Sequence, residues 1–559
     1  MTPHDLDALL GRATARLAAG PDPAVRQLLE TAARSFPDHA GLACRLADAL
    51  HLEGKLAEAA AGYRRALALD ERLLDAWYGL GAALLRAGAY GSAAEALRQA
   101  VALHPKADGA RANLAEALYQ LGEVDPALAE FRAVQATVGP ELRAKALTNI
   151  ACTIPGSPAA TNTDILAARQ RWADVIAANI RPLAPVPRPP SPKLRVGYVS
   201  SFFGAANWMK PVFGVMNHHD RARFEVHLIS LGPLPTAEAG YRDYPDDVVW
   251  PAAALDNGAL ARRIAAAGID VLVDLNGYSA QPRLGLFLYR PAPVQIGWFN
   301  MYATTGLPVY DCLVGDAAVI PAEEEAFYIE RIERVPGSYL AFEVLYPVPD
   351  VTPPPCLDNG FLTFGCLGSA YKITGEVIAA WARILHGSPG SQLLLKNSTL
   401  GDDSNRSALL GRFARAGIGA ERLILDGRSE HFDFLKAYGR IDVALDTFPY
   451  NGGTTTTEAL WQGVPVLTFG GDRWASRTSR SLLLAGGLPD WVAADEPAYV
   501  RQAVALANDA GTPAYLAALR ASLRDRLRAS PACDSAGLCR ALEDLYLRLS
   551  PRPKRGDSP

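Results

Sequence analysis

The sequence predicts an α-helical repeat array followed by two doubly wound α/β domains, and three observations support this fold class. Apolar and small residues recur every 34 residues through the N-terminal part. Two proline-rich breaks, 181–193 and 348–355, divide the remainder. Short β-branched runs alternate with helical stretches after the first break, which is typical of parallel sheets covered by helices.

The 34-residue spacing holds in four independent columns. These are Gly54, Gly88 and Gly122; Tyr63, Leu97 and Phe131; Leu46, Leu80 and Leu114; and Ala59, Ala93 and Ala127. A glycine supplies the turn between two helices, and alanine lets the helices approach closely. The pattern resembles the tetratricopeptide repeat, with about four copies over residues 6–137; a generic Ala-rich bundle is the alternative. We assign residues 1–140 to this array.

Such an array presents an extended concave surface to a protein or peptide. The sequence leaves open whether this surface serves self-assembly, as in a homodimer, or the recognition of another protein. We expect the repeats to supply binding and not chemistry.

The rest of the chain is divided by its composition. The first break contains six prolines and predicts a helical and Pro-rich connector over 141–192. A first α/β lobe is expected over 193–350, a second over 351–550 and a tail over 551–559. Ligands bind open α/β sheets at the carboxyl ends of the strands, so we expect a cleft there between the lobes. No GxGxxG follows the first strand and no GxxxxGK[ST] occurs, which disfavours a dinucleotide dehydrogenase or a P-loop protein.

Composition excludes several classes of protein. Of 559 residues, 49% are hydrophobic and 20% charged, which suits globular domains and not a disordered chain. The 55 Lys and Arg nearly balance the 59 Asp and Glu, so the basic excess of nucleic-acid-binding proteins is missing. No apolar run approaches about 18 residues, so we expect no membrane span. Seven dispersed cysteines without CxxC spacing favour a reducing cytoplasm over a disulfide framework or a zinc site.

The densest group of candidate binding residues lies in 441–483. A predicted strand ends at Asp446, and a glycine-containing turn leads to four threonines that open a helix. Threonine hydroxyls and free N–H groups at a helix N-terminus favour an anion, and Glu458 one turn later is placed to accept ribose hydroxyls. For the threonines alone, an ordinary helix cap is the alternative.

This segment, DTFPYNGGTTTTEALWQGVPVLTFGGDRWASR, closely resembles the nucleotide-binding segment of the O-linked N-acetylglucosamine transferases, glycosyltransferase family 41. VGYVSSFFG, IDVLVDLNGYS, RPAPVQIGWFNMYATTG and TFGCLGSAYKIT show further resemblance. The resemblance implies a GT-B fold of two Rossmann-like domains and a UDP-sugar donor. It also implies inverting transfer to Ser or Thr of proteins, with no metal or other cofactor.

The resemblance also assigns roles to residues. Lys372 matches the family lysine that contacts the donor diphosphate, where a cation stabilises the leaving group. Thr454 and Thr455 match the diphosphate-binding threonines, and Glu458 matches the ribose-binding acid. The implied catalytic residues are Lys372, Asp274 and Tyr278, the last two near the acceptor. The implied nucleotide-sugar-binding residues are Thr454, Thr455, Thr456, Glu458, Gly453, Tyr371 and His431.

Two departures from the family pattern affect the expected mechanism. Ala206 occupies the position of a histidine once proposed as the catalytic base, so a donor phosphate oxygen or a different donor geometry would have to replace it. Phe434 occupies a usual histidine position, and either His431 takes over its role or His431 is a plain surface residue. The tandem His218–His219 has no third ligand at metal spacing and is interpreted as a loop.

Three functions remain for this sequence. The preferred one is protein O-glycosylation, with acceptor proteins bound through the repeats. The second is a related transferase that uses another nucleotide sugar, for example a nonulosonic acid donor for flagellin. The third is a repeat-based scaffold with little catalysis, which Lys372 and the threonine cluster disfavour.

Overall fold

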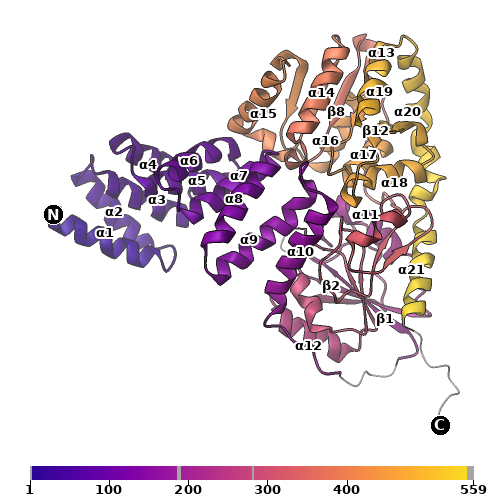
Figure 1. Cartoon of the computed structure of the whole chain (residues 1–559), viewed down its shortest axis with the longest axis horizontal. Coiled ribbons are helices and arrows are strands. Elements are labelled where there is room, and N and C mark those ends of the chain that lie inside the picture. Colours follow the sequence, from indigo (N-terminus) through magenta and orange to yellow (C-terminus); the bar gives the residue numbers. More distant parts are fainter. Residues whose placement is uncertain (1–2, 186–190, 280–282, 551–559) are drawn as a thin grey trace.

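The protein is described by a computed structural model that covers residues 3–185, 191–279 and 283–550. Figure 1 shows an arm of paired helices that leads into two α/β lobes stacked one above the other. This is the fold class that the sequence predicts. Residues 186–190 of the predicted proline-rich connector and the predicted tail, 551–559, lie outside the described residues.

The arm and connector consist of paired antiparallel helices. They are α1 (Pro3–Leu17), α2 (Pro23–Ser35), α3 (Ala40–Leu52), α4 (Leu56–Leu69), α5 (Leu74–Ala87), α6 (Tyr90–Leu103), α7 (Asp108–Gln120), α8 (Val124–Thr137), α9 (Pro140–Thr153) and α10 (Asn162–Ala177). The glycines of the 34-residue column have φ between 78° and 79°, a left-handed conformation that favours glycine. The alanines of the repeat column are fully buried, so paired helices pack closely.

Helices α9 and α10 fasten the arm to the first lobe. Arg169 of α10 is 1% exposed and donates to the carbonyl oxygens of Ala151 and Thr304, at 3.2 and 2.5 Å. Its guanidinium also lies 3.9 Å from the ring centroid of Tyr278. The connector is therefore packed as part of the first lobe.

The first lobe is built on seven parallel strands in the order β3-β2-β1-β4-β5-β6-β7. Its elements are β1 (Leu194–Ser200), α11 (Ala206–Met216), β2 (Phe224–Ser230), β3 (Val248–Pro251), α12 (Asn257–Ala267), β4 (Val271–Asp274), β5 (Val294–Gly297), β6 (Cys312–Gly315) and β7 (Ile332–Arg334). Six of seven residues in β1 are buried, as expected for a central strand with helices on both faces.

The second lobe has six parallel strands in the order β10-β9-β8-β11-β12-β13. Its elements are α13 (Cys356–Asn359), β8 (Thr363–Cys366), α14 (Gly375–Gly387), β9 (Gln392–Lys396), α15 (Asp403–Arg415), β10 (Leu423–Asp426), α16 (His431–Lys436), β11 (Val443–Leu445), α17 (Thr454–Trp461), β12 (Val466–Phe469), α18 (Thr478–Ala485), β13 (Val492–Ala493), α19 (Glu496–Asn508), α20 (Thr512–Arg528) and α21 (Ser535–Leu549). Both sheets direct their strand carboxyl ends to the region between the lobes.

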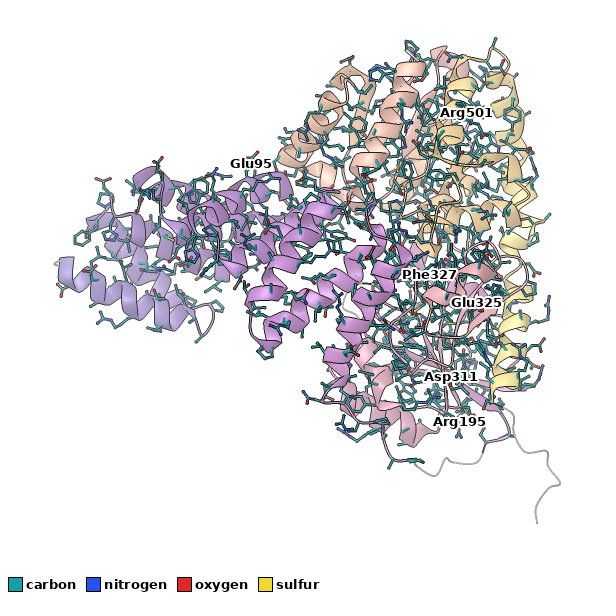
Figure 2. The ribbon with its side chains drawn as sticks, viewed as in Figure 1. Glu95, Arg195, Asp311, Glu325, Phe327 and Arg501 are labelled. Carbon is teal, nitrogen blue, oxygen red and sulfur yellow. The ribbon has the colours of Figure 1, made fainter. Side chains whose placement is uncertain are left out.

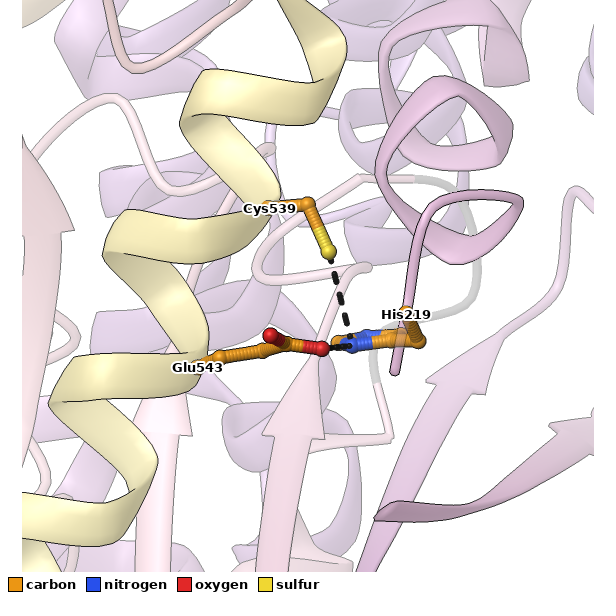
Figure 3. Close-up of side chains that lie close together, drawn as sticks. All are labelled: His219, Cys539 and Glu543. Carbon is orange, nitrogen blue, oxygen red and sulfur yellow. Dashed lines mark hydrogen bonds and ion pairs between the residues drawn. The ribbon is translucent and has the colours of Figure 1, made fainter. Parts of the chain in front are cut away.

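The last helix, α21, returns from the second lobe to pack against α11 of the first (Figure 1). Figure 3 shows His219 between Glu543 and Cys539 of α21, with Nδ1 2.8 Å from Glu543 Oε1 and 3.5 Å from Cys539 Sγ. His219 Nε2 lies 2.7 Å from the Tyr198 hydroxyl. His219 is therefore held on both ring nitrogens, and its contacts pin α21 to the first lobe.

The same trio is the group of three potential metal ligands that the structure brings together within its described residues. No third ligand for the tandem histidines is evident from the sequence because Cys539 and Glu543 are more than 300 residues away from His219. The Nδ1 to Oε1 separation is that of a hydrogen bond, and Glu543 Oε1 also accepts the Asp220 N–H at 2.8 Å. The trio is thus satisfied by its own hydrogen bonds.

Within the described ranges, no helix is both long and apolar enough to cross a membrane. Figure 2 places Glu95 of α6 where the arm meets the second lobe, with Arg501 on that lobe and Asp311 on the first.

Candidate functional site

A cavity of about 520 Å³ lies between the lobes. Gln120 at the end of α7 reaches it from the arm, and α11 lines it from the first lobe. The second lobe supplies most of the lining, from loops that follow β8, β9 and β10 and from the first turns of α16 and α17. The cavity is therefore at the strand carboxyl ends, where the sequence predicts the cleft.

Lys372 lines this cavity from a 3₁₀ turn, η4 (Ala370–Lys372), after β8. Its Nζ donates to the carbonyl oxygen of Asn451 at 2.6 Å and lies 4.2 Å from the ring centroid of Tyr450. Burial lowers the pKa of Lys372 to about 8, although Asp446 and Cys366 act in the opposite direction. Lys372 is thus a positioned cation close to the turn that precedes α17.

The N-terminus of α17 opens onto the same cavity. Gly453, Thr454 and Thr455 line it, and no side chain caps the helix, so its first N–H groups are available to an anion. The turn before it is held by Asp446, whose Oδ1 accepts the Gly452 N–H at 2.8 Å. The cavity thus combines a cation with a helix N-terminus.

Thr456 lies apart from the other predicted threonines. It does not line the large cavity, and its hydroxyl is 2.8 Å from the Ser479 hydroxyl in the buried interior. The third position of the helix turns it inward, because successive residues in an α-helix point in directions about 100° apart. The hydroxyl of Thr456 therefore helps to hold α17 against the interior, and its binding role stays a prediction.

Glu458 closes one end of the cavity and meets Lys210 of the first lobe. Glu458 Oε1 lies 3.6 Å from Lys210 Nζ and 3.8 Å from His431 Nε2, and both the lysine and the glutamate side chains are 2% exposed. Burial raises the pKa of Glu458, and Lys210 partly offsets this. Among the described residues, Oε1 accepts no hydrogen bond within 3.5 Å and faces only the more distant Lys210 ammonium and His431 ring, so a hydroxyl donor entering the cavity would complete the contacts of a buried acceptor.

His431, predicted as a ligand residue or a surface residue, lines the cavity from the start of α16. Its ring packs edge-on against Tyr346, with 5.3 Å between ring centroids. Burial and the nearby charge of Lys210 lower the pKa of His431. The imidazole is therefore neutral near pH 7 and stands beside Glu458.

A second cavity, of about 500 Å³, lies beside the first between the arm and the first lobe. Tyr302, Tyr371 and Tyr450 line both cavities. The ring of Tyr302 is edge-on to Tyr450 at 5.1 Å, and Tyr371 lies 6.2 Å from Tyr450. These three rings form the wall between the cavities, and the predicted ligand residue Tyr371 belongs to it.

Asp274 and Tyr278, both predicted to lie near the acceptor, are placed differently. Asp274 lines neither cavity, and its oxygens accept the N–H groups of Asn276 and Gly277 and the hydroxyl of Tyr310. Tyr278 lines the second cavity, but its hydroxyl donates to Thr305 O at 2.6 Å. Both residues stabilise the loops at the end of β4, because a buried carboxylate and a buried hydroxyl require such partners.

Several residues that line the first cavity are not among those predicted from the sequence. They are Asn207 and Trp208 of α11, Asn397, Ser398 and Thr399 after β9, and Gly427, Arg428 and Ser429 after β10. The last two groups follow predicted strands, so the carboxyl-end rule would have indicated them. Asn207 and Trp208 do not directly follow a predicted strand, so this rule does not indicate them.

Two facing parallel sheets, with a cation and an open helix N-terminus in the cleft, define the class of two-lobed α/β proteins with an anion-binding site between the lobes. The sequence model of glycosyl transferase family 41 matches residues 186–344 and 356–542, and the chain therefore belongs to that family. Tetratricopeptide-repeat models match residues 47–88 and 84–149.

Curated relatives agree with the family. The chain is 34% identical over 377 residues to the probable UDP-N-acetylglucosamine–peptide N-acetylglucosaminyltransferase SPINDLY of Solanum lycopersicum, covering 66% of this chain and 40% of the relative. Identity to the probable transferase of the same kind named SEC in Arabidopsis thaliana is 30% over 371 residues, covering 64% and 37%. The match thus spans about two fifths of these longer proteins.

A solved structure is similar over nearly its whole length. It is a lysine-to-methionine mutant of the Thermobaculum terrenum O-GlcNAc transferase, with a TM-score of 0.75 and 32% identity, covering 91% of this chain and 97% of that one. The predicted GT-B arrangement of two Rossmann-like lobes after a repeat arm is confirmed.

Proposed function

We propose that this chain is an inverting protein O-glycosyltransferase that transfers N-acetylglucosamine from UDP-N-acetylglucosamine to Ser or Thr of proteins. The observation that carries the proposal is that Lys372 and the open N-terminus of α17 line one cavity with the buried acceptor Glu458. Membership in the family and the printed activities of the similar proteins support the donor and the acceptor class.

The cavity can hold each part of a nucleotide-sugar donor. Lys372, Thr454 and Thr455 would bind the diphosphate, because a cation and free N–H groups both stabilise negative charge. The unsatisfied Oε1 of Glu458 would accept the ribose hydroxyls. His431, neutral beside Glu458, would border the base.

In the reaction, the acceptor oxygen forms a bond to the anomeric carbon from the face opposite the diphosphate, and the bond from that carbon to the phosphate oxygen breaks. The electron pair leaves with UDP, and Lys372 and the α17 N-terminus stabilise its charge. Of the described residues that line the two cavities, the carboxylates are Glu116, Glu430 and Glu458 and the imidazole is His431. With Ala206 unable to accept a proton, the acceptor proton passes to a phosphate oxygen of the donor.

The second cavity suits a polypeptide acceptor. Trp208 Nε1 and Asn300 Nδ2 are buried donors there, and no described residue accepts a hydrogen bond from either. Carbonyl oxygens of an extended peptide would accept from both, and the aromatic wall would pack against its side chains. The arm that borders this cavity would hold more distant parts of the acceptor protein.

The proposal also covers the metal requirement, the cellular location and the alternative functions. The reaction needs no metal, because Lys372 supplies the cation at the leaving group. The protein acts in the cytoplasm, where its dispersed free thiols remain reduced. A homodimer stays a prediction. The printed activities of the similar proteins favour N-acetylglucosamine over a nonulosonic acid, and a scaffold would not need the positioned Lys372.

Thermal-shift measurements against UDP, GDP and CMP and their sugars test the proposal, because a bound ligand raises stability by RT ln(1 + [L]/Kd). We expect UDP and UDP-N-acetylglucosamine to raise Tm more than the other ligands. Stabilisation by CMP or GDP compounds alone would contradict the proposed donor.

A further inference from the structure

The arm makes direct contact with the loop that carries Lys372. Tyr371, the residue before Lys372, stacks on Tyr119 of α7 with 5.0 Å between ring centroids and 19° between ring planes. Offset stacking of two rings is a directional contact that fixes the position of both side chains. One face of Tyr371 is therefore set by a residue of the repeat array.

The turn after α7 holds the other side of the same loop. Gly122 has φ of 78° and packs so closely that an added Cβ would collide with the carbonyl oxygens of Ile373 and Ala370. Ala370 begins η4, and Ile373 directly follows Lys372. The backbone on both sides of Lys372 thus rests on this repeat turn.

Arg412 of α15 links the turn and the loop from the second lobe. It is buried, donates to Ile373 O at 2.8 Å and to Gly122 O at 3.5 Å, and also donates to Leu121 O. One guanidinium therefore satisfies carbonyl oxygens of the arm and of the Lys372 loop together. Because the guanidinium is rigid and planar, we expect a shift of the turn after α7 to move the Lys372 loop as well.

A second set of hydrogen bonds, one repeat earlier, also holds the arm against the second lobe. Asn405 of α15 accepts the Gly91 N–H at 2.9 Å and donates to Gly88 O at 2.7 Å. Ser404 Oγ accepts the Ser92 N–H at 3.1 Å. The arm is thus fixed to the second lobe at two successive repeat turns.

From these contacts we propose that Tyr119, Gly122 and Arg412 are positioning residues for Lys372, so that the repeat array forms part of the donor site in addition to binding acceptors. This inference rests on the proposed function of Lys372. It goes beyond the expectation from the sequence that the repeats supply binding and not chemistry.

The repeat itself provides a matched control. Gly54 and Gly88 occupy the same turn as Gly122, with φ of 79° each, so alanine strains the backbone equally at all three positions. A Cβ at Gly54 or Gly88 meets nothing within 4 Å, whereas at Gly122 it meets the Lys372 loop. Both variants therefore strain the backbone of the same turn, and only Gly122→Ala also displaces the Lys372 loop.

The first experiment measures hydrolysis of UDP-N-acetylglucosamine without any protein acceptor, using the full chain. We expect Gly122→Ala to lower kcat by about tenfold to a hundredfold, the scale of a misplaced catalytic group, while Gly54→Ala stays within about twofold of wild type. Equal rates in the two variants would overturn the inference. Tyr119→Leu should show the same loss, and Tyr119→Phe, which keeps the ring, should recover most of it.

A second readout does not depend on the donor. Hydrogen–deuterium exchange of residues 369–374 should accelerate in Gly122→Ala and not in Gly54→Ala, because only the former displaces the loop. Identical exchange in both variants would overturn the inference, even if the wild-type chain used another donor. Failure of the wild type to bind or hydrolyse UDP-N-acetylglucosamine would contradict the proposed function instead.

Discussion

Lys210 Nζ and Glu458 Oε1 lie 3.6 Å apart, and the two side chains come from opposite lobes of the protein. Burial lowers the pKa of Lys210, whereas the charge of Glu458 raises it. Lys210 Nζ also donates to Asn207 O at 3.0 Å, so the first lobe holds the lysine in place. The pair joins the lobes at the end of the cavity where Glu458 would bind ribose.

Lys210→Met should destabilise the chain by about 3–5 kcal/mol, because it leaves a buried carboxylate without its cation. The double variant Lys210→Met/Glu458→Gln should regain much of the loss, since no charge is then left unpaired. Urea unfolding measures both. Arg331→Met, which breaks an exposed pair with Glu333, should cost at most about 1 kcal/mol. A Lys210→Met variant as stable as wild type would show that the pair does not join the lobes.

Lys372→Ala should lower kcat for transfer by about 10²–10³, the effect of removing one preorganised charge stabiliser. Steady-state transfer with saturating donor measures the change. Lys436→Ala is the control, because Lys436 is exposed and pairs with Asp433. Retention of more than half of the wild-type activity by Lys372→Ala would contradict the assignment.

The pH dependence of kcat/KM for the donor should report the ammonium group of Lys372. Its pKa of about 8 means that the charged form is present below pH 8 and is lost as the pH rises through that value. Asp446 and Cys366 face the ammonium and keep the pKa from falling further. Lys372→Arg should remove the alkaline decline, because guanidinium stays charged above pH 12. A wild-type profile that is flat to about pH 10 would refute this.

Ala206→His should change kcat by less than about tenfold, the equivalent of 1.4 kcal/mol. Ala206 begins α11 and lines neither cavity, and in the proposed reaction a phosphate oxygen of the donor already takes the acceptor proton, so positioning and leaving-group stabilisation dominate the rate. Single-turnover transfer across pH 6–9 measures the effect. A gain above a hundredfold, with a new dependence near pH 6.5, would mean that the wild type lacks a required base.

Glu543→Gln should lower stability near pH 7 by about 1–3 kcal/mol, because the charged acceptor of His219 and Asp220 is lost. Burial raises the pKa of Glu543, but the hydrogen bonds from His219 and Asp220 lower it by more, so the pKa lies below that of an ordinary glutamate. The stabilisation is therefore present above about pH 4.3 and is lost as the pH falls through the lower folded value. Tm measured from pH 3 to 7 for both forms should converge at the acid end. A chelator that lowers the wild-type Tm would instead show that the trio holds a metal ion.

Local patterns predicted much of the fold. The 34-residue spacing indicated the left-handed turn glycines, since each repeat requires the same turn. The return of α21 to the first lobe was not predicted, because it depends on contacts such as Tyr198 to Tyr546 between residues 348 positions apart. Such contacts have no local periodicity.

For the same reason, the sequence predicted some residues of the candidate site and not others. Lys372 and Glu458 lie in continuous motifs and do line the cavity. Asp274 lies in an equally clear motif, but its oxygens are occupied by neighbours that the fold brings to it. Lys210 and Tyr119 act across domain boundaries, so their roles became visible only once the lobes and the arm were placed together.

We propose that Lys372 serves transfer of a sugar from a UDP donor to protein hydroxyls. The most direct measurement incubates the full chain with sugar-labelled UDP-N-acetylglucosamine and a protein acceptor mixture, and follows label on protein and release of UDP. We expect one UDP for each sugar found on protein, in addition to the UDP from hydrolysis measured without an acceptor, a β-linked sugar on Ser or Thr, and loss of both products in Lys372→Ala. Label that enters protein only from a CMP or GDP sugar, or an unchanged yield in Lys372→Ala, would contradict it.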